Sequence, residues 1–171
     1  MLRFLFPRLT ANPERGASLF AAATERARKQ HWYVEGQVPD TLDGRFRALA
    51  TLTALVVVRV EQDGEAGDAV SVALTERFIE VMEAEHREFG LGDPKLGRTV
   101  RKLVGSLARR VEIWRRALAA EPMGWEAATR ESLYEGEVDE RALRHSAEAL
   151  REFWSRLEAA DLGAIAGGKL Q

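Results

Sequence analysis

The chain has 171 residues, of which 46% are hydrophobic and 30% charged, as expected for one globular domain that buries most of its apolar surface. Its net charge of −2 gives no overall attraction to nucleic acid or anionic lipid, so any electrostatic partner surface has to be local. Because it has no cysteine, the chain has no disulfide and no thiolate nucleophile or metal ligand, which fits a reducing cytoplasm.

Residues 1–16 form a basic, apolar segment in which Pro7 and Arg8 interrupt the run of apolar side chains. We therefore expect it to be part of the mature protein rather than a signal peptide. It suits either a membrane interface or packing against the rest of the chain. The longest apolar run, residues 48–58, is much shorter than the roughly 20 residues that span a bilayer, which predicts a buried helix.

Strong helix formers dominate, and no stretch alternates apolar and polar residues long enough to indicate a sheet. The first predicted helix covers residues 17–33 and ends near the turn at 36–39. Asp40 or Thr41 can cap a second helix that starts near Leu42. From Phe46 to Val60 its apolar residues cover more than one face, so we expect it to be the central helix.

The acidic, glycine-containing segment 61–68 predicts an exposed loop. A third helix over residues 69–89 has one apolar side and a natural stop at Gly90. Asp93 suits an N-cap and Pro94 a first helical position, so a fourth helix is predicted over residues 94–120.

A shorter helix is expected after Pro122 and ends near Gly136, and Asp139 can cap the last long helix. The predicted buried face of that last helix consists of Leu143, Ala147, Leu150, Phe153, Trp154 and Leu157. The fold prediction is an all-α, single-domain bundle of about six helices over residues 17–160, followed by a frayed, flexible tail at 161–171.

Candidate catalytic or metal-binding groups are few. The histidines His31, His86 and His145 fall in different predicted helices without the spacing of metal ligands. The glycines of residues 90–97 imitate a phosphate loop but lack its lysine ending and preceding strand. Asp40, Asp43 and Arg45 are better explained by capping and an ion pair than by acid–base catalysis. We predict no enzyme, no metal and no cofactor.

The fourth predicted helix separates its side chains by type. Leu96, Val100, Leu103, Leu107, Val111, Trp114 and Leu118 fall on one face at 100° per residue. The opposite side, here called the basic face, carries Arg98, Arg101, Lys102, Arg109 and Arg116. It is either a solvated surface or a docking site for an anionic partner such as ribosomal RNA, an acidic protein or phospholipid headgroups. Nothing in the sequence indicates DNA binding.

Two ordered segments resemble the signatures of a known family. The first signature comprises Tyr33, Val38, Pro39, Asp40, Thr41, Gly44, Arg45 and Phe46. The second comprises Arg87, Glu88, Gly90, Gly92 and Asp93. Together they resemble the ubiquinol:cytochrome c reductase chaperone family, which includes mitochondrial cytochrome b assembly factors and bacterial homologues. Leu52 stands where the family usually has a histidine, so the chain resembles a divergent, bacterial-type member.

The resemblance implies a non-catalytic assembly chaperone that binds newly made cytochrome b through a surface near the two signature turns. In mitochondria such proteins associate with the translating ribosome, which makes the ribosome a second expected partner. The implied location is the cytoplasm, with peripheral contact at the inner membrane. Two alternatives stay open: a small-ligand or enzymatic pocket near residues 40–45 and 90–95, and a peripheral membrane protein anchored by residues 1–9.

Overall fold

The structure is a computed structural model that describes residues 16–88, 93–120 and 124–170. All of the regular elements in these ranges are helical, which confirms the all-α, single-domain prediction. In chain order they are α1 (Ala17–Ala27), the 3-10 turn η2 (Gln30–Trp32), α2 (Leu42–Val60), the 3-10 turn η3 (Glu61–Asp63), α3 (Gly64–Glu88), α4 (Asp93–Ala119), α5 (Trp125–Leu133), α6 (Glu140–Ala159) and α7 (Leu162–Ala166).

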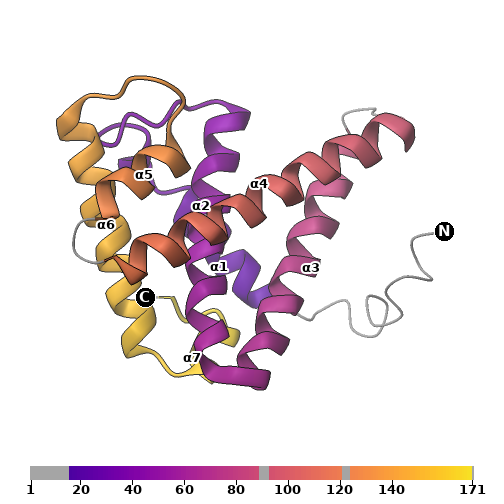
Figure 1. The fold of residues 1–171 in the computed structure, drawn as a ribbon. Coiled ribbons are helices and arrows are strands. Elements are labelled where there is room, and N and C mark those ends of the chain that lie inside the picture. Colours follow the sequence, from indigo (N-terminus) through magenta and orange to yellow (C-terminus); the bar gives the residue numbers. More distant parts are fainter. Residues whose placement is uncertain (1–15, 89–92, 121–123, 171) are drawn as a thin grey trace.

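Helix α2 is the centre of the bundle, as its sequence predicts. It packs against α1, α3, α4, α5 and α6, which surround it in Figure 1. Every residue from 48 to 60 is buried, including Thr51, Thr53 and Arg59. A helix that is apolar on more than one face is stable only when other helices cover it on all sides, and this arrangement provides that cover.

The first helix is shorter than predicted, because it ends at Ala27 and the chain continues as η2. Lys29 is extended between them, with φ −62° and ψ 133°. In an unbroken helix Trp32 would lie about 140° from Ala27 and point away from the apolar stripe. The break instead buries the Trp32 ring, whose Nε1 donates to the carbonyl oxygen of Arg26 at 2.9 Å.

The prediction of a loop over residues 61–68 is wrong, because this segment forms η3 and the first turn of α3. Its side chains are largely exposed, as expected, but Gly67 is buried. A Cβ added at Gly67 would lie 1.7 Å from the carbonyl oxygen of Val60. This glycine therefore allows the start of α3 to approach the end of α2. In the sequence alone, a glycine in a polar segment indicates a loop, which explains the wrong prediction.

Helices α3 and α4 pack against each other on one side of the bundle. The end of α3 and the start of α4 project together away from the other helices (Figure 1). Leu74, Phe78 and Met82 of α3 are buried, as predicted. The stop expected at Gly90 lies outside the described residues.

Helices α5 and α6 cover the opposite side of α2, and α5 also packs against α4 through an aromatic pair. The rings of Trp114 in α4 and Trp125 in α5 lie 5.1 Å apart between centroids. Asp139 caps α6 by accepting from the backbone N–H groups of Arg141 and Ala142, which confirms the predicted cap. All six residues of the predicted α6 face are buried.

The prediction of a frayed tail after residue 160 is also wrong. Asp161 caps the short helix α7, and Ile165 and Leu170 are buried. Arg26 of α1 donates from Nη1 to the carbonyl oxygen of Leu170 at 2.6 Å. Alanine and glycine are common in this segment because α7 packs closely on α1: a Cβ at Gly168 would lie 2.6 Å from the Ser18 carbonyl oxygen.

Candidate functional site

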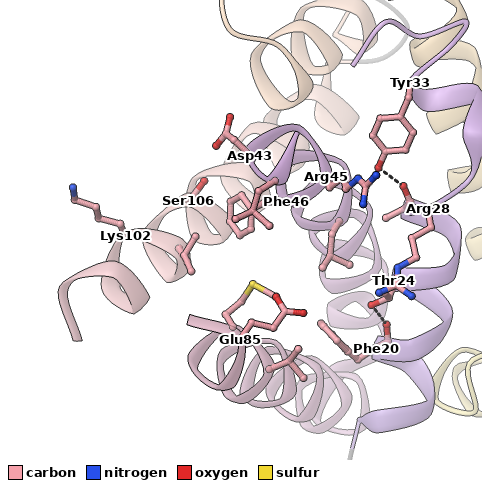
Figure 2. A pocket seen from close by; sticks show the side chains of 16 residues that line it. Phe20, Thr24, Arg28, Tyr33, Asp43, Arg45, Phe46, Glu85, Lys102 and Ser106 are labelled. Carbon is pink, nitrogen blue, oxygen red and sulfur yellow. Dashed lines mark hydrogen bonds between the residues drawn. The ribbon is translucent and has the colours of Figure 1, made fainter. Parts of the chain in front are cut away.

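A cavity of about 730 Å³ lies between α1, α2, α3 and α4, here called the α1–α4 groove. Side chains from all four helices point toward it in Figure 2. Its lining residues are Phe20, Thr24, Ala27, Arg28, Tyr33, Leu42, Asp43, Arg45, Phe46, Leu49, Val81, Met82, Glu85, Lys102, Leu103 and Ser106. A cavity of this size is in the range of small-molecule and peptide sites.

The floor of the groove is apolar and rests on an aromatic cluster. The fully buried Phe78 ring lies 6.3 Å from the ring of Phe20 and 6.0 Å from that of Phe46. Phe46 itself is half-buried, and Leu42 at the edge of the groove is 64% exposed. The groove therefore presents apolar surface to solvent on a rigid base.

The first signature contributes to both the rim and the floor of this groove. The Tyr33 hydroxyl donates to the carbonyl oxygen of Ala27 at 2.6 Å, and burial raises the pKa of the phenol. Arg45 pairs with Asp40 at 2.6 Å, and hydrogen bonding to this guanidinium lowers the pKa of the Asp40 carboxyl. Tyr33, Arg45 and Phe46 all line the groove.

The other residues of the first signature build the turn that places this rim. Val38 is buried, and its N–H donates to the Trp32 carbonyl oxygen at 3.0 Å. Thr41 caps α2 by accepting from the Gly44 N–H at 3.2 Å. Gly44 packs against Pro39 so closely that an added Cβ would lie 1.9 Å from the Pro39 carbonyl oxygen.

The second signature begins beside the groove but contributes less to it. Arg87 pairs with Glu83 at 2.7 Å, and Glu88 is exposed at the end of α3. The groove residue Glu85 is two positions before Arg87. Gly90 and Gly92 lie outside the described residues, and Asp93 is the first residue of α4.

The comparisons with known proteins agree with this architecture. The model of the family described as "Ubiquinol-cytochrome C chaperone" matches residues 34–171. The chain belongs to this family. The crystal structure of the Cbp3 homolog from Brucella abortus is similar, with 26% sequence identity and a TM-score of 0.75 over 98% of this chain and 94% of that chain. None of the curated proteins compared with the chain matches it.

Membership of this chaperone family supports an assembly role. Within residues 16–88, 93–120 and 124–170, no three histidine, aspartate or glutamate side chains converge as a metal site. Over the same ranges, no helix is both long enough and apolar enough to cross a membrane.

The basic face of the chaperone is only partly available to a partner. Arg109 pairs with Glu131 at 2.8 Å, and the Arg116 Nε donates to the Glu112 carbonyl oxygen at 3.4 Å. Arg98, Arg101 and Lys102 are exposed, and Lys102 also lines the α1–α4 groove. Arg109 and Arg116 are exposed as well, but their guanidinium groups are already engaged by these neighbouring acceptors.

Sequence reasoning missed Arg110, which is only 6% exposed. Its guanidinium donates to the Ser132 carbonyl oxygen from Nε at 3.1 Å and from Nη2 at 2.8 Å, and it lies 5.9 Å from the centroid of the Phe46 ring. Burial lowers its pKa to about 10, so it remains a cation at neutral pH. Its position in the sequence could have predicted this burial, because Arg110 is three residues after Leu107 and four before Trp114, within the apolar stripe.

The histidines lie far apart in the sequence without the spacing of metal ligands, but two of them meet in the fold. His31 and His145 are 114 positions apart, yet His31 Nδ1 lies 3.1 Å from His145 Nε2. This contact could not be predicted from sequence spacing, because it depends on the break after α1 and on the packing of α6. The pair lies outside the α1–α4 groove, whose lining residues include neither histidine.

Proposed function

We propose that this protein is a non-catalytic assembly chaperone for the cytochrome b subunit of ubiquinol:cytochrome c reductase, and that it holds an apolar segment of that subunit in the α1–α4 groove. The single observation behind the proposed site is the apolar groove of about 730 Å³ that the first signature lines. The family to which the chain belongs supports the assembly role.

The shape and lining of the groove suit a helical client segment. Phe46, Met82 and Leu103 supply apolar contacts from three different helices, and a flexible methionine adapts to varied partner side chains. Arg28, Glu85 and Lys102 bring charge of both signs to the lining. Such a surface binds an apolar side of a helix and leaves its polar side in water.

A small-ligand site is less well supported. The groove includes Asp43 and Arg45, but each of these side chains is already paired: Asp43 with Arg47 at 2.6 Å and Arg45 with Asp40. An active site would place unpaired polar groups around one point. The polar groups here stabilise the start of α2.

A matched pair of surface variants tests this proposal. Leu42 and Val72 are both exposed apolar residues, at 64% and 51%, but only Leu42 lines the groove. Cytochrome b would be synthesised in a cell-free system with detergent and tagged chaperone, and recovery of the two together would be measured. We expect Leu42→Glu to weaken capture by roughly tenfold, equivalent to about 1.4 kcal/mol, and Val72→Glu to have no effect.

An unrelated multi-spanning membrane protein, made in the same system, is the control for specificity. Equal recovery of this protein and cytochrome b would contradict the proposed client. Unchanged capture by Leu42→Glu would remove the groove from the proposal.

The exposed cations Arg101 and Lys102 are the proposed second contact, with the anionic surface of a ribosome that is synthesising the client. The proposed location is the cytoplasm, beside the inner membrane. Cosedimentation with ribosomes should decrease as salt increases and should weaken in Arg101→Glu/Lys102→Glu. In the control variant Lys102→Glu/Arg109→Glu cosedimentation should weaken less, because Arg109 is already paired with Glu131. Cosedimentation independent of salt would contradict this contact.

A further inference from the structure

A second cavity, of about 310 Å³, lies between η2 and α6, away from the α1–α4 groove. Its lining residues are Arg26, Lys29, His31, Trp32, His145, Glu148, Ala149, Glu152 and Arg156. Both histidines are half-buried, so their rings are held by the protein while one side remains open to the cavity. The proposed chaperone function uses none of these side chains.

The two imidazoles meet through their ring nitrogens. His31 Nδ1 and His145 Nε2 are 3.1 Å apart, and the ring planes are inclined at 68°. Metal–imidazole bonds are about 2.0–2.1 Å long, so nitrogens at this separation subtend roughly 95–100° at a shared metal ion. That angle lies between those of octahedral and tetrahedral coordination.

The surroundings hold the pair in this arrangement. The His31 ring packs on the ring of Trp32 with centroids 4.3 Å apart. The Trp32 Nε1 in turn donates to the Arg26 carbonyl oxygen, so its indole is fixed at the end of α1. His145 lies within the regular helix α6. Two ligands presented by fixed elements lose little conformational freedom when they bind an ion.

The cavity is lined by charged side chains of both signs, with three cations and two carboxylates. Arg26, Lys29 and Arg156 are positive, whereas Glu148 and Glu152 are negative, and Glu35 also acts electrostatically on His31. The Arg26 guanidinium is engaged by its bond to the Leu170 carbonyl oxygen and lies 4.7 Å from the centroid of the Phe153 ring, although Arg26 and Lys29 both still act electrostatically on His31. Glu148 is one helical turn after His145, on the same side of α6.

We propose that His31 and His145 form a binding site for a late first-row divalent transition-metal ion, with water completing the coordination shell. Imidazole nitrogen suits Cu²⁺, Ni²⁺ and Zn²⁺ and does not suit Mg²⁺ or Ca²⁺. Among the described residues no third protein ligand converges on the pair, so the site is open and exchangeable. A bound ion would join the segment that leads into the first signature to the last long helix.

Calorimetric titration of the full chain with Cu²⁺ and Zn²⁺ at neutral pH tests the site. We expect one ion per chain, with Cu²⁺ bound more tightly than Zn²⁺ and no binding of Mg²⁺. His31→Gln and His145→Gln should each weaken binding by roughly tenfold or more, since outer-shell changes alone cost that much. His86→Gln is the matched control, because it removes the third histidine, on α3, and should leave binding unchanged.

Electron paramagnetic resonance of the Cu²⁺-loaded parent gives a readout that does not depend on folding of the variants. Coupling to two imidazole nitrogens is expected. Absence of stoichiometric binding, or equal binding by the parent and both His31 and His145 variants, would overturn the proposal and leave the pair as a hydrogen bond between rings. Neither result bears on capture of cytochrome b, which the Leu42 variant tests separately.

Discussion

The α-carbon of Gly44 faces the carbonyl oxygen of Pro39 at a distance that leaves no space for a side chain, since an added Cβ would lie 1.9 Å from that oxygen. This contact folds the start of α2 back onto the preceding turn. It places Leu42 and Arg45 at the edge of the α1–α4 groove. The glycine of the first signature therefore helps to shape the candidate site, although it does not itself line the groove.

Gly44→Ala should destabilise the protein by about 2–4 kcal/mol, because the Pro39 turn or the first turn of α2 has to move. Chemical denaturation monitored by circular dichroism would measure the change. Gly105→Ala is the matched control in an exposed helical position with nothing within 4 Å of its added Cβ. It should stabilise the protein by about 0.5–1 kcal/mol through helix propensity. Equal effects of the two substitutions would contradict the close approach at Gly44.

Arg59 should be needed for the end of α6. Although buried in α2, it donates to the carbonyl oxygens of Leu157 at 3.0 Å and Ala160 at 3.1 Å, and it pairs with Asp63 at 2.6 Å. Arg59→Met would remove this donor from the Ala160 carbonyl and leave the Leu157 carbonyl with the Ala160 N–H at 3.3 Å, so it should cost about 2–4 kcal/mol. Hydrogen exchange should accelerate in α6 and α7 before the rest of the chain. Arg156→Met, at an exposed pair with Glu152, should cost less than about 1 kcal/mol; a similar loss there would argue against this specific role.

The helices were predictable wherever a single apolar periodicity continued without a break. The burial of residues 48–60 in α2 and the buried face of α6 follow directly from such patterns. The predicted element boundaries were wrong where residues that indicate a loop in the local sequence are instead needed for tertiary packing. Gly67 and Gly168 are required by close helix packing, and the break before η2 is required by burial of Trp32.

The candidate site was predictable only in part. Signature residues 33 and 45–46 do line the groove, so the segment around them was correctly singled out. Its opposite wall, with Val81, Met82 and Leu103, depends on how α3 and α4 pack, which the sequence pattern does not specify. The His31–His145 contact likewise joins two segments whose proximity is a property of the whole bundle.

Arg110 and Arg109 are adjacent in α4, but their truncation should destabilise the protein to very different extents. Arg110→Ala leaves the Ser132 carbonyl oxygen without its two guanidinium donors and opens space beside Phe46, so it should cost about 3 kcal/mol. Arg109→Ala removes only an exposed pair with Glu131 and should cost less than about 1 kcal/mol. Denaturation midpoints of the two variants would measure the difference. The interpretation of Arg110 as a buried anchor would be wrong if the two losses were equal.

The two tyrosines of the chain should ionise late as pH rises. Burial raises the pKa of Tyr134 and of Tyr33 above the ordinary value near 10. Tyr134 has one hydroxyl hydrogen, which it donates to the Gly36 carbonyl oxygen at 2.5 Å, so Ser146 is the donor in the 2.7 Å contact between the two hydroxyls. A phenolate at this position would lose the bond to Gly36.

The sign of the resulting pH dependence follows from proton binding. Above about pH 10 the unfolded chain releases its phenol protons first, so the folded state holds more protons and stability falls as pH rises. Phenolate absorbance should therefore appear at a higher pH in the folded parent than in the denatured chain. Tyr134→Phe should cost about 1–2 kcal/mol at neutral pH, because the Gly36 carbonyl loses its donor, and should make the alkaline decrease in stability less steep. Ionisation of both phenols near pH 10 in the folded parent would contradict the burial that the structure gives them.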